Sequence, residues 1–531
     1  MTVYLLPHLL RDSAARHPER TALIFKGDKL SYGELESRSA ALAAGLVELG
    51  VAPGDRVGTV FDKSFDALVA LFAVMRSGAC YVPIDPVAPT SRADKIVRNT
   101  DMKVLLCSKD RAPKFVAELD PQTTLEHVVV SGETTELSAE GFAVKAFGAV
   151  AGDGAALVEP GITDTYPAYI LHTSGSTGMP KGVALSHLNA LTFVNMAADY
   201  WQATADDVFV SHAPFHFDLS VFDFYVAFKV GAAVALLPES YSIFPKKLCE
   251  YIDKHGITVW NSVSSVLTLI AERGKMDAYD LGSMRAIIFS GEVLPLKYLR
   301  QLKAKMPKAG FFNVYGQTEA NSSMCYPVGE LPADDGWKTP IGKALPNFEV
   351  FAVDGEGNKV SAPGVEGELY VRSSTPALGY WRDPERTAER FVVDPDRPWA
   401  STRLYATGDL VKMDAEGNFL FVGRKDHLVK SRGYRIEIGE IELAMNAVDG
   451  VQQGVIVTVP DDLIGNRIIA WVELDGSREV EPNDIIAYCR ERLPHYMVPE
   501  IVEIETPLPK TSTMKIDRKG LQARSIETHG K

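Results

Sequence analysis

The sequence contains few cysteines and no signal-peptide core. The cysteines are Cys80, Cys107, Cys249, Cys325 and Cys489. They are odd in number, lie far apart and have neither CxxC nor zinc-ligand spacing, so they exclude a disulfide framework and a zinc finger. This usage favours a reducing, cytoplasmic compartment. Near the N-terminus, Pro7 and His8 interrupt the apolar residues that a secretory signal would need.

Long apolar runs and excess positive charge are also missing. The longest apolar run, residues 67–75, ends at Arg76 and falls well short of the roughly 20 residues that span a bilayer. The chain has 55 Lys and Arg against 69 Asp and Glu, a net charge of −14. Nucleic acid and anionic membranes would repel such a protein. We therefore expect neither a nucleic-acid partner nor membrane association.

The length and apolar pattern predict a multi-domain α/β protein. A chain of 531 residues is too long for one hydrophobic core. Short β-branched runs alternate with segments of helical periodicity, which is typical of βαβ units with buried parallel strands. The runs include residues 208–210, 234–237, 257–260, 286–289 and 311–314. We expect a large, multi-lobed N-terminal domain built from such units.

Two later regions have different patterns. The predicted strands at residues 348–353, 368–371 and 419–422 have little helix between them and indicate a small, barrel-like β unit. Strand and helix patterns start again after Arg424, with candidates at residues 455–459, 468–474 and 484–493. They predict a small α+β domain, which the resemblance described below implies is mobile. We therefore divide the chain into residues 1–424 and 425–531.

A loop rich in glycine and hydroxyl side chains follows the predicted strand 168–171. It contains Thr173, Ser174, Gly175, Ser176, Thr177 and Gly178 and is followed by Lys181. Glycines let backbone N–H groups approach a polyphosphate, hydroxyls donate to it, and lysine offsets its charge. Pro180 and Gly182 break the Walker A pattern. A flexible linker is the alternative, but a linker needs neither the strand before it nor Pro180-Lys181-Gly182 after it.

Other motifs follow in a fixed order along the chain. They occupy residues 30–35, 76–85, 315–319, 367–370, 405–410, 423–426, 431–437 and 515–518. With the loop, this series resembles the acyl-adenylate-forming superfamily of acyl-CoA synthetases, luciferases and adenylation domains of nonribosomal peptide synthesis. It covers nearly the whole chain, which makes it far more specific than any single motif. The chain is most similar to a free-standing amino-acid adenylating enzyme.

The resemblance implies a two-step ligase reaction with ATP and Mg²⁺ as cofactors. A substrate carboxylate attacks the α-phosphorus of ATP, and the acyl group then passes to a phosphopantetheine thiol. This chemistry depends on positioning and charge stabilisation more than on acid–base catalysis. The implied catalytic residues are Lys515, Thr173 and Glu319, with the Glu319 carboxylate as the Mg²⁺ ligand. Lys515 would contact both the carboxylate and the phosphate.

The resemblance further implies a nucleotide site and a hinge. The implied ATP-binding residues are Thr173, Ser174, Gly175, Ser176, Thr177, Gly178, Lys181, Gly291, Glu292, Asn313, Tyr315, Gly316, Thr318, Asp409, Arg424 and Lys515. Asp409 would accept hydrogen bonds from the ribose. Asp426 would be the hinge about which the small domain rotates after adenylation, so that Lys515 withdraws and residues 432–435 enter. Residues 512–514 depart from the Asn-Gly that often precedes this lysine.

Asp218 distinguishes between the subclasses of the superfamily. In the enzymes that activate amino acids, the matching aspartate pairs with the substrate ammonium, and without a cation its burial would be costly. A helix N-cap or a surface aspartate is the alternative. The implied pocket residues are Asp218, Leu219, Phe222, Asn261, Ile288, Ser290, Val314, Ser322 and Ser323. Apart from Asp218 and Lys515 the pocket has no charge, which favours a neutral, small or medium side chain, and Ser290 leaves both α- and β-amino acids open.

The expected partner is a discrete phosphopantetheinylated acyl or peptidyl carrier protein in natural-product biosynthesis. Too few residues follow Lys515 for a carrier domain within the chain, and Arg432 and Arg435 would offer a basic face to the carrier. Two alternatives remain open. One is an acyl- or aryl-CoA ligase that uses free CoA. The other is a non-catalytic binding protein, against which the retention of Glu319 and Lys515 argues.

Overall fold

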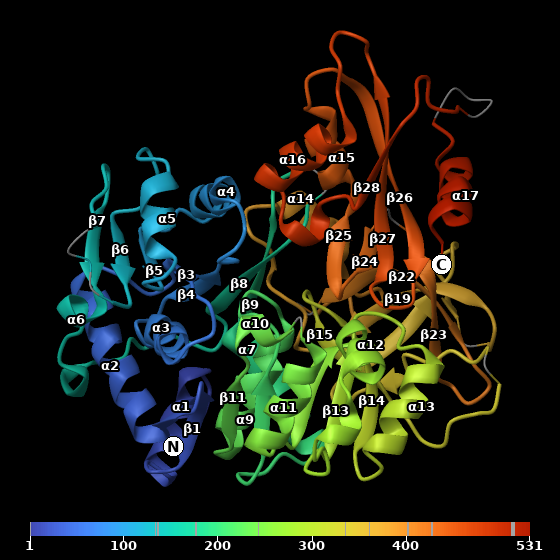
Figure 1. Cartoon of the computed structure of the whole chain (residues 1–531). Helices are drawn as coiled ribbons and strands as arrows, with labels where there is room; N and C mark the ends of the chain where they lie inside the picture. Colours follow the sequence, from blue (N-terminus) through green and yellow to red (C-terminus); the bar gives the residue numbers. More distant parts are fainter. Residues whose placement is uncertain are drawn as a thin grey trace.

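The computed structural model describes residues 2–132, 134, 137–175, 178–242, 244–334, 336–360, 362–400, 403–425, 428–510 and 516–530. Two large sheets enclose a shared layer of helices, and further helices cover their outer faces (Figure 1). The C-terminal region, defined here as residues 428–530, forms sheets of its own. It lies over one end of the larger part, as the orange and red segments of Figure 1 show. The predicted α/β class is confirmed.

The first large sheet has nine strands and a parallel centre. Their spatial order is β16 (Lys343–Ala344), β15 (Asn321–Pro327), β14 (Gly310–Gln317), β13 (Ala286–Ser290), β12 (Val259–Val263), β10 (Val208–Ser211), β11 (Ala233–Leu236), β1 (Thr21–Phe25) and β2 (Asp28–Ser31). Strands β14 to β1 pair in parallel, whereas β15, β16 and β2 are antiparallel additions at the edges. Five of the central strands were predicted from their apolar runs.

The second large sheet has eight strands and leads into the glycine-rich loop. Their order is β20 (Gly379–Tyr380), β9 (Lys181–Ser186), β8 (Pro167–Thr173), β4 (Cys80–Pro83), β3 (Arg56–Val60), β5 (Val104–Cys107), β6 (His127–Val130) and β7 (Ala143–Ala146). Strand β8 ends at Thr173, where the loop begins, and β9 starts at Lys181 after it. The loop is therefore held between two paired antiparallel strands.

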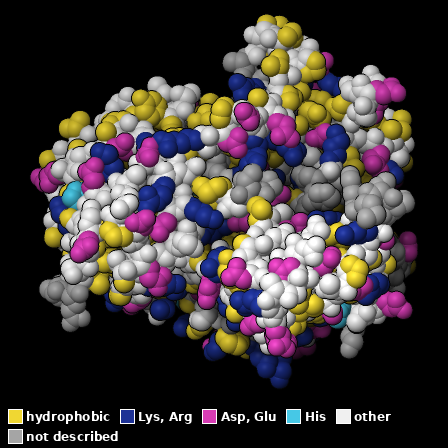
Figure 2. All heavy atoms as spheres, turned by 90° about the horizontal axis from the view of Figure 1, so that it is seen from above, with side chains coloured by type: hydrophobic (Ala, Val, Ile, Leu, Met, Phe, Trp, Pro, Cys, Tyr) yellow, Lys and Arg dark blue, Asp and Glu magenta, His cyan; other side chains and the backbone are white. Residues whose placement is uncertain are grey.

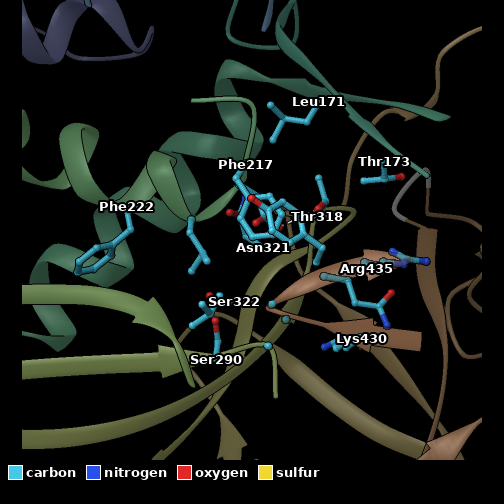
Figure 3. A pocket seen from close by; sticks show the side chains of 18 of the residues that line it. Leu171, Thr173, Phe217, Phe222, Ser290, Thr318, Asn321, Ser322, Lys430 and Arg435 are labelled. Carbon is cyan, nitrogen blue, oxygen red and sulfur yellow. Dashed lines mark hydrogen bonds between the residues drawn. The ribbon is translucent and has the colours of Figure 1, made fainter. Parts of the chain in front are cut away.

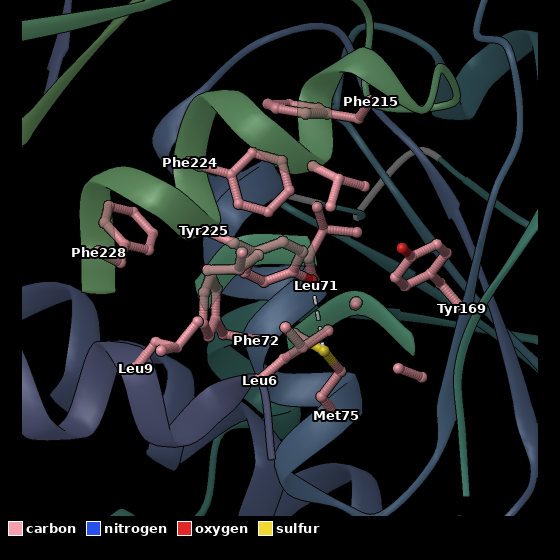
Figure 4. Close-up of a cluster of buried hydrophobic side chains, with 14 of the residues drawn as sticks. Leu6, Leu9, Leu71, Phe72, Met75, Tyr169, Phe215, Phe224, Tyr225 and Phe228 are labelled. Atoms are coloured by element: carbon pink, nitrogen blue, oxygen red, sulfur yellow. Dashed lines mark hydrogen bonds between the residues drawn. The ribbon is translucent and has the colours of Figure 1, made fainter. Parts of the chain in front are cut away.

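The helices between the two sheets form the largest hydrophobic core. They are α1 (Pro7–Arg16), α2 (Tyr32–Glu48), α3 (Phe65–Arg76), α7 (His187–Tyr200), α8 (Leu219–Val221), a π-helical segment (Phe222–Val226) and α9 (Ala227–Val230). Helix α3 is apolar on nearly all sides because it packs against neighbours all round. In Figure 4, Phe72 of α3 lies among Phe224, Tyr225 and Phe228. This core fixes the short α8, which directly follows Asp218.

Further helices cover the outer faces and edges. Helices α4 (Thr90–Thr100) and α5 (Ala112–Glu118) pack on the eight-stranded sheet. Helices α11 (Pro245–His255), α12 (Ser264–Arg273) and α13 (Leu296–Lys305) pack on the nine-stranded sheet. The shorter helices are α6 (Phe147–Val150), α10 (Glu239–Ser242) and α14 (Pro384–Arg390), with 3-10 turns at Gly154–Ala156, Met276–Ala278 and His495–Met497.

The expected barrel-like unit is an open antiparallel sheet. It comprises β18 (Lys359–Val360), β17 (Glu349–Val353), β19 (Glu366–Arg372), β22 (Arg403–Met413) and β21 (Phe391–Val393), and β23 (Phe419–Arg424) also pairs with β22. Within the described residues, no pairing joins the two ends of this sheet. It packs instead against the β14–β15 hairpin, where Tyr315 and Met324 enter its core. The hairpin is thereby buried on this side.

The C-terminal region has a two-stranded hairpin and a three-stranded sheet. The strands are β24 (Leu428–Ser431), β25 (Tyr434–Glu437), β26 (Val451–Asp461), β27 (Gly465–Leu474) and β28 (Ile501–Ile504), and the helices are α15 (Ile438–Asn446), α16 (Pro482–Arg492) and α17 (Arg518–His529). One apolar cluster joins the sheet to α15 and α16, and a second lies under α17.

On the face seen in Figure 2, Lys and Arg intermingle with Asp and Glu and do not gather into a patch of one sign. Among the helices of the described ranges, none is long and apolar enough to span a membrane.

Gly316, near the end of β14, provides a test of the hairpin. A Cβ at this position would stand 2.2 Å from the backbone oxygen of Asn321 on β15, a contact that cannot form without moving the hairpin. Gly316→Ala should therefore reduce the free energy of unfolding by about 1–3 kcal/mol in a denaturant titration. Gly423→Ala on β23 is the control, because a Cβ there meets nothing within 4 Å. Equal unfolding midpoints for the two variants would contradict the hairpin geometry.

Candidate active site

A cavity opens where the nine-stranded sheet, the glycine-rich loop and the C-terminal region meet (Figure 3). The larger part contributes side chains from β8, α7, α8, β12, β13 and the β14–β15 hairpin. The C-terminal region contributes Lys430, Gly433, Tyr434, Arg435 and Tyr496. Segments far apart in the sequence thus share one cavity, at the carboxyl ends of the parallel strands, where α/β sheets usually bind ligands.

Asp218 lies on the cavity wall immediately before α8. It occupies the N-cap position of that helix, but its carboxylate makes no capping hydrogen bond there. Its Oδ2 instead accepts a hydrogen bond of 2.8 Å from the Thr318 hydroxyl. Burial raises the pKa of Asp218. A carboxylate in this position favours a cationic ligand, because the ion pair would offset the cost of its desolvation.

Most of the expected side-chain pocket surrounds Asp218. Leu219, Phe222, Asn261, Ile288, Ser290 and Ser322 line the same cavity. Val314 and Ser323 do not line it. Val314 belongs to the main hydrophobic core, and Ser323 is buried without a hydrogen-bond partner for its hydroxyl. Phe193 of α7 and Trp201, which directly follows that helix, also line the wall, and sequence reasoning did not identify them.

The glycine-rich loop contacts the C-terminal region through several polar groups. The Ser174 hydroxyl donates to the Arg435 carbonyl oxygen at 2.8 Å and accepts from the Glu437 N–H at 3.0 Å. The Gly175 N–H donates to Glu440 at 2.9 Å, and Lys181 Nζ lies 2.5 Å from Glu437. The Gly175 N–H and the Lys181 ammonium, which could donate to a polyphosphate, are therefore bonded to carboxylates in this arrangement.

The other candidate residues of the loop differ in their surroundings. Thr173 and Ser174 line the cavity, and the Thr173 hydroxyl is buried without a partner. Gly178 lies farther along, where its carbonyl oxygen accepts from Lys95 at 3.1 Å. The candidates Ser176 and Thr177 lie outside the described residues, as do Asp426 and Lys515.

Glu319 occupies the turn between β14 and β15 and is fully buried. Arg435 Nη1 lies 2.9 Å and 2.7 Å from its two carboxylate oxygens, and the Tyr380 hydroxyl donates to it at 2.8 Å. Burial alone would raise its pKa, but Arg435 and Lys181 hold the pKa of Glu319 at about 2. The carboxylate is therefore ionised and holds a cation from the C-terminal region.

The expected nucleotide residues fall into two groups. Gly291, Gly316, Thr318 and Arg424 line the cavity. Asn313, Tyr315, Glu292 and Asp409 are not part of its wall. Asn313 donates to the Pro340 carbonyl oxygen at 2.7 Å. Asp409 is 1% exposed and receives hydrogen bonds from Tyr315, Gln317 and Arg424. In this arrangement both oxygens of the Asp409 carboxylate already accept hydrogen bonds from protein side chains.

The family models decide which class of enzyme this cavity belongs to. The model of AMP-binding enzymes matches residues 10–381, and the model of the AMP-binding enzyme C-terminal domain matches residues 440–515. The chain belongs to the AMP-binding enzyme family. The resemblance expected from the motif series is confirmed, and the chain is an enzyme of the ligase class.

Named relatives align with this AMP-binding enzyme over nearly its whole length. An L-proline–(L-prolyl-carrier protein) ligase from Pseudomonas fluorescens is 35% identical, covering 98% of this chain and 99% of that protein. A ligase of the same name from Streptomyces coelicolor is 34% identical, covering 97% and 96%. The crystal structure of IdnL1 superposes with a TM-score of 0.80 at 29% identity, covering 96% of this chain and 100% of that chain.

The β24–β25 hairpin of this AMP-binding enzyme differs from the expected basic face. Its turn residues Arg432 and Gly433 both have positive φ, as a two-residue hairpin turn requires. Lys430 pairs directly opposite Arg435, so both side chains point toward the cavity (Figure 3). Arg432 instead pairs with Glu500 at 3.0 Å. In a hairpin whose turn is Arg432-Gly433, Lys430, Arg435 and Glu437 fall on the same face of the two strands, whereas Arg432 lies in the turn. This spacing is the sequence signal that would have distinguished Arg435 from Arg432.

Glu292 predicts a pH-dependent contact between the two parts. Its carboxylate accepts from the Gly433 N–H at 3.0 Å, and burial raises its pKa from the ordinary 4.5 to about 7. Undocking the C-terminal region would expose this carboxyl and lower its pKa. Docking should therefore be strongest below pH 4.5 and weaken as the pH rises toward 7, because only the undocked form ionises readily.

Energy transfer between two fluorescent labels measures this docking. Val158→Cys and Ser477→Cys provide exposed labelling positions in the two parts, and the five native cysteines are buried. The transfer efficiency should change between pH 5 and pH 8, and Glu292→Gln should flatten that change. Identical pH curves for both proteins would contradict this role of Glu292.

Proposed function

We propose that this enzyme adenylates an amino acid with a neutral, small or medium side chain and transfers the aminoacyl group to a carrier-protein thiol. The observation that carries the proposal is the Asp218 carboxylate, which faces the same cavity as Ser174 of the glycine-rich loop. A ligand in this cavity would meet an anionic receptor at one end and phosphate-binding groups at the other. An amino acid joined to a nucleotide phosphate has the matching charges.

Apart from Arg424 and from Lys430 and Arg435 of the C-terminal region, the wall near Asp218 supports a neutral side chain. Leu219, Phe222 and Ile288 provide apolar surface, and Asn261, Ser290 and Ser322 provide uncharged polar groups. A charged side chain would lie unpaired against this wall, which would reduce its binding. Ser290, at the end of β13, is compatible with an amine placed for either an α- or a β-amino acid.

ATP and Mg²⁺ are the proposed cofactors. Ser174, Gly175 and Lys181 would hold the phosphates, because hydroxyl, backbone N–H and ammonium groups all donate to phosphate oxygens. Glu319 suits Mg²⁺ because it is a fully buried, ionised carboxylate that already holds a cation. Within the described residues, no group of three or more His, Cys, Asp or Glu side chains gathers there, so phosphate oxygens and water would complete the coordination. When bound, the ion would offset phosphate charge.

The two steps require two positions of the C-terminal domain. We propose that residues 1–424 form one domain, residues 425–531 the other, and Asp426 the hinge. In the present arrangement, three residues of the C-terminal region occupy the groups that would hold MgATP. Arg435 contacts Glu319, Glu437 contacts Lys181, and Glu440 contacts the Gly175 N–H. They would have to leave before MgATP binds, and Lys515 would then enter to bridge carboxylate and phosphate. The docked arrangement therefore suits thiol transfer, after pyrophosphate has left.

A discrete carrier protein is the proposed thiol donor. Two relatives that align over nearly their whole length are named as ligases of a prolyl-carrier protein, which supports a carrier protein as the partner. The phosphopantetheine thiol would attack the mixed anhydride, forming the thioester and releasing AMP. Free CoA carries the same thiol arm and is the alternative acceptor.

Pyrophosphate exchange tests the amino-acid assignment. Neutral α- and β-amino acids should support exchange, whereas matched acids without the amine should not. Asp218→Ala should lower kcat/KM for the preferred amino acid by roughly 100-fold or more, because the substrate ammonium would lose its partner in a buried site. Mass spectrometry of a holo carrier protein and of free CoA then identifies the thiol acceptor.

Leu219→Ile is a control that changes the pocket without changing its charge. It should alter the preference among amino acids while leaving acids without an amine inactive. Exchange with acids that lack an amine, or an Asp218→Ala enzyme that retains its kcat/KM, would overturn the assignment.

A further inference from the structure

The three-residue turn Thr318–Glu319–Ala320 contacts both Asp218 of the cavity wall and Arg435 of the C-terminal region. It joins β14 to β15 and is closed by a hydrogen bond of 2.9 Å from the Ala320 N–H to the Gln317 carbonyl oxygen. The Thr318 hydroxyl contacts Asp218, whereas the Glu319 carboxylate contacts Arg435 and Tyr380. Of these two adjacent residues, Thr318 therefore contacts the anionic receptor Asp218, and Glu319 provides the cation-binding carboxylate.

Among the described residues, the Thr318 hydroxyl is the side chain that donates a hydrogen bond to the Asp218 carboxylate, and the Leu219 N–H and the charge of Lys430 also favour its ionised form. No Lys, Arg or His of that part of the chain forms an ion pair with Asp218. Burial makes the ionised form of such a carboxylate costly, and the neighbouring Glu319 adds repulsion. The hydroxyl of Thr318 opposes both effects, because a hydrogen bond to the charged form favours that form.

We propose that Thr318 is a positioning residue of the amine receptor, which holds Asp218 ionised and oriented for the substrate ammonium. This rests on the proposed amino-acid adenylation. The hydroxyl engages Oδ2, which leaves Oδ1 for the ammonium. The assignment differs from the nucleotide contact that the family resemblance implies, and it adds a specificity-determining residue outside the expected amino-acid pocket.

The turn also explains how recognition of the amine could affect adenylation. Consecutive Cα atoms are about 3.8 Å apart, so Thr318 and Glu319 cannot move independently by much. An ammonium bound to Asp218 fixes Thr318, and Thr318 in turn fixes the backbone that carries Glu319. An acid without an amine would bind without fixing this turn. Selection for amino acids would then act on adenylation as well as on binding.

Thr318→Val and Thr318→Ser test the hydroxyl directly. Valine has nearly the same shape without the donor, and serine keeps the donor. In pyrophosphate exchange, Thr318→Val should raise KM for the preferred amino acid by about 10-fold or more, the loss expected for one hydrogen bond to a charged group. KM for ATP should stay within about 2-fold of wild type, and Thr318→Ser should restore most of the loss.

The pH profile separates positioning from a general structural defect. Without the hydroxyl, Asp218 would take up a proton more readily. The acid limb of kcat/KM for the amino acid should therefore shift to higher pH in Thr318→Val and return in Thr318→Ser. Unfolding midpoints of all three proteins, measured alongside, should agree.

Three results would overturn this assignment. A raised KM for ATP with an unchanged KM for the amino acid would make Thr318 a nucleotide contact. An unchanged acid limb, or a serine variant as impaired as the valine variant, would leave it only a structural residue. If none of the amino acids tested supports exchange in the wild-type enzyme, the proposed function itself fails. If the wild-type enzyme is active and Thr318→Val has the same activity, only the role of Thr318 fails.

Discussion

The ion pair between Glu319 and Arg435 joins the two parts of this enzyme at its active site. A fully buried carboxylate needs a cation or several hydrogen-bond donors, and here a residue more than a hundred positions later supplies the cation. Under the proposed function, Glu319 would also hold Mg²⁺. One carboxylate would therefore serve two cations that cannot be present together, and exchange between them would link metal binding to movement of the C-terminal region.

The neighbouring contacts follow the same rule of charge. Glu437 meets Lys181, and Glu440 meets both the Gly175 N–H and Arg92. In the docked arrangement the C-terminal region thus brings negative groups to the donors that would hold phosphate, and a positive group to the carboxylate that would hold metal. This complementarity explains why docking and MgATP binding would compete even though neither changes the fold of the larger part.

The sequence was informative where a residue's role depends on its own segment. The apolar runs identified the central strands, and the family resemblance of the motif series placed Asp218 among the pocket residues, where it lines the cavity. Roles that depend on long-range pairing were not predictable. The contact of Arg435 with Glu319, the hydrogen bond from Thr318 to Asp218 and the packing of Val314 into the core arise from tertiary structure. The open β18–β21 sheet was mistaken for a barrel-like unit because antiparallel strand patterns do not reveal closure.

The central claim is that Arg435 and Mg²⁺ compete for Glu319, and a titration with MgATP tests it most directly. With labels at positions 158 and 477, MgATP should shift the energy transfer of the wild-type enzyme to that of the undocked form. Arg435→Ala should reach the same end point at a lower MgATP concentration, because one competing cation is absent. The claim would be contradicted if saturating MgATP bound to wild-type enzyme without changing the energy transfer, or if Arg435→Ala left the required concentration unchanged.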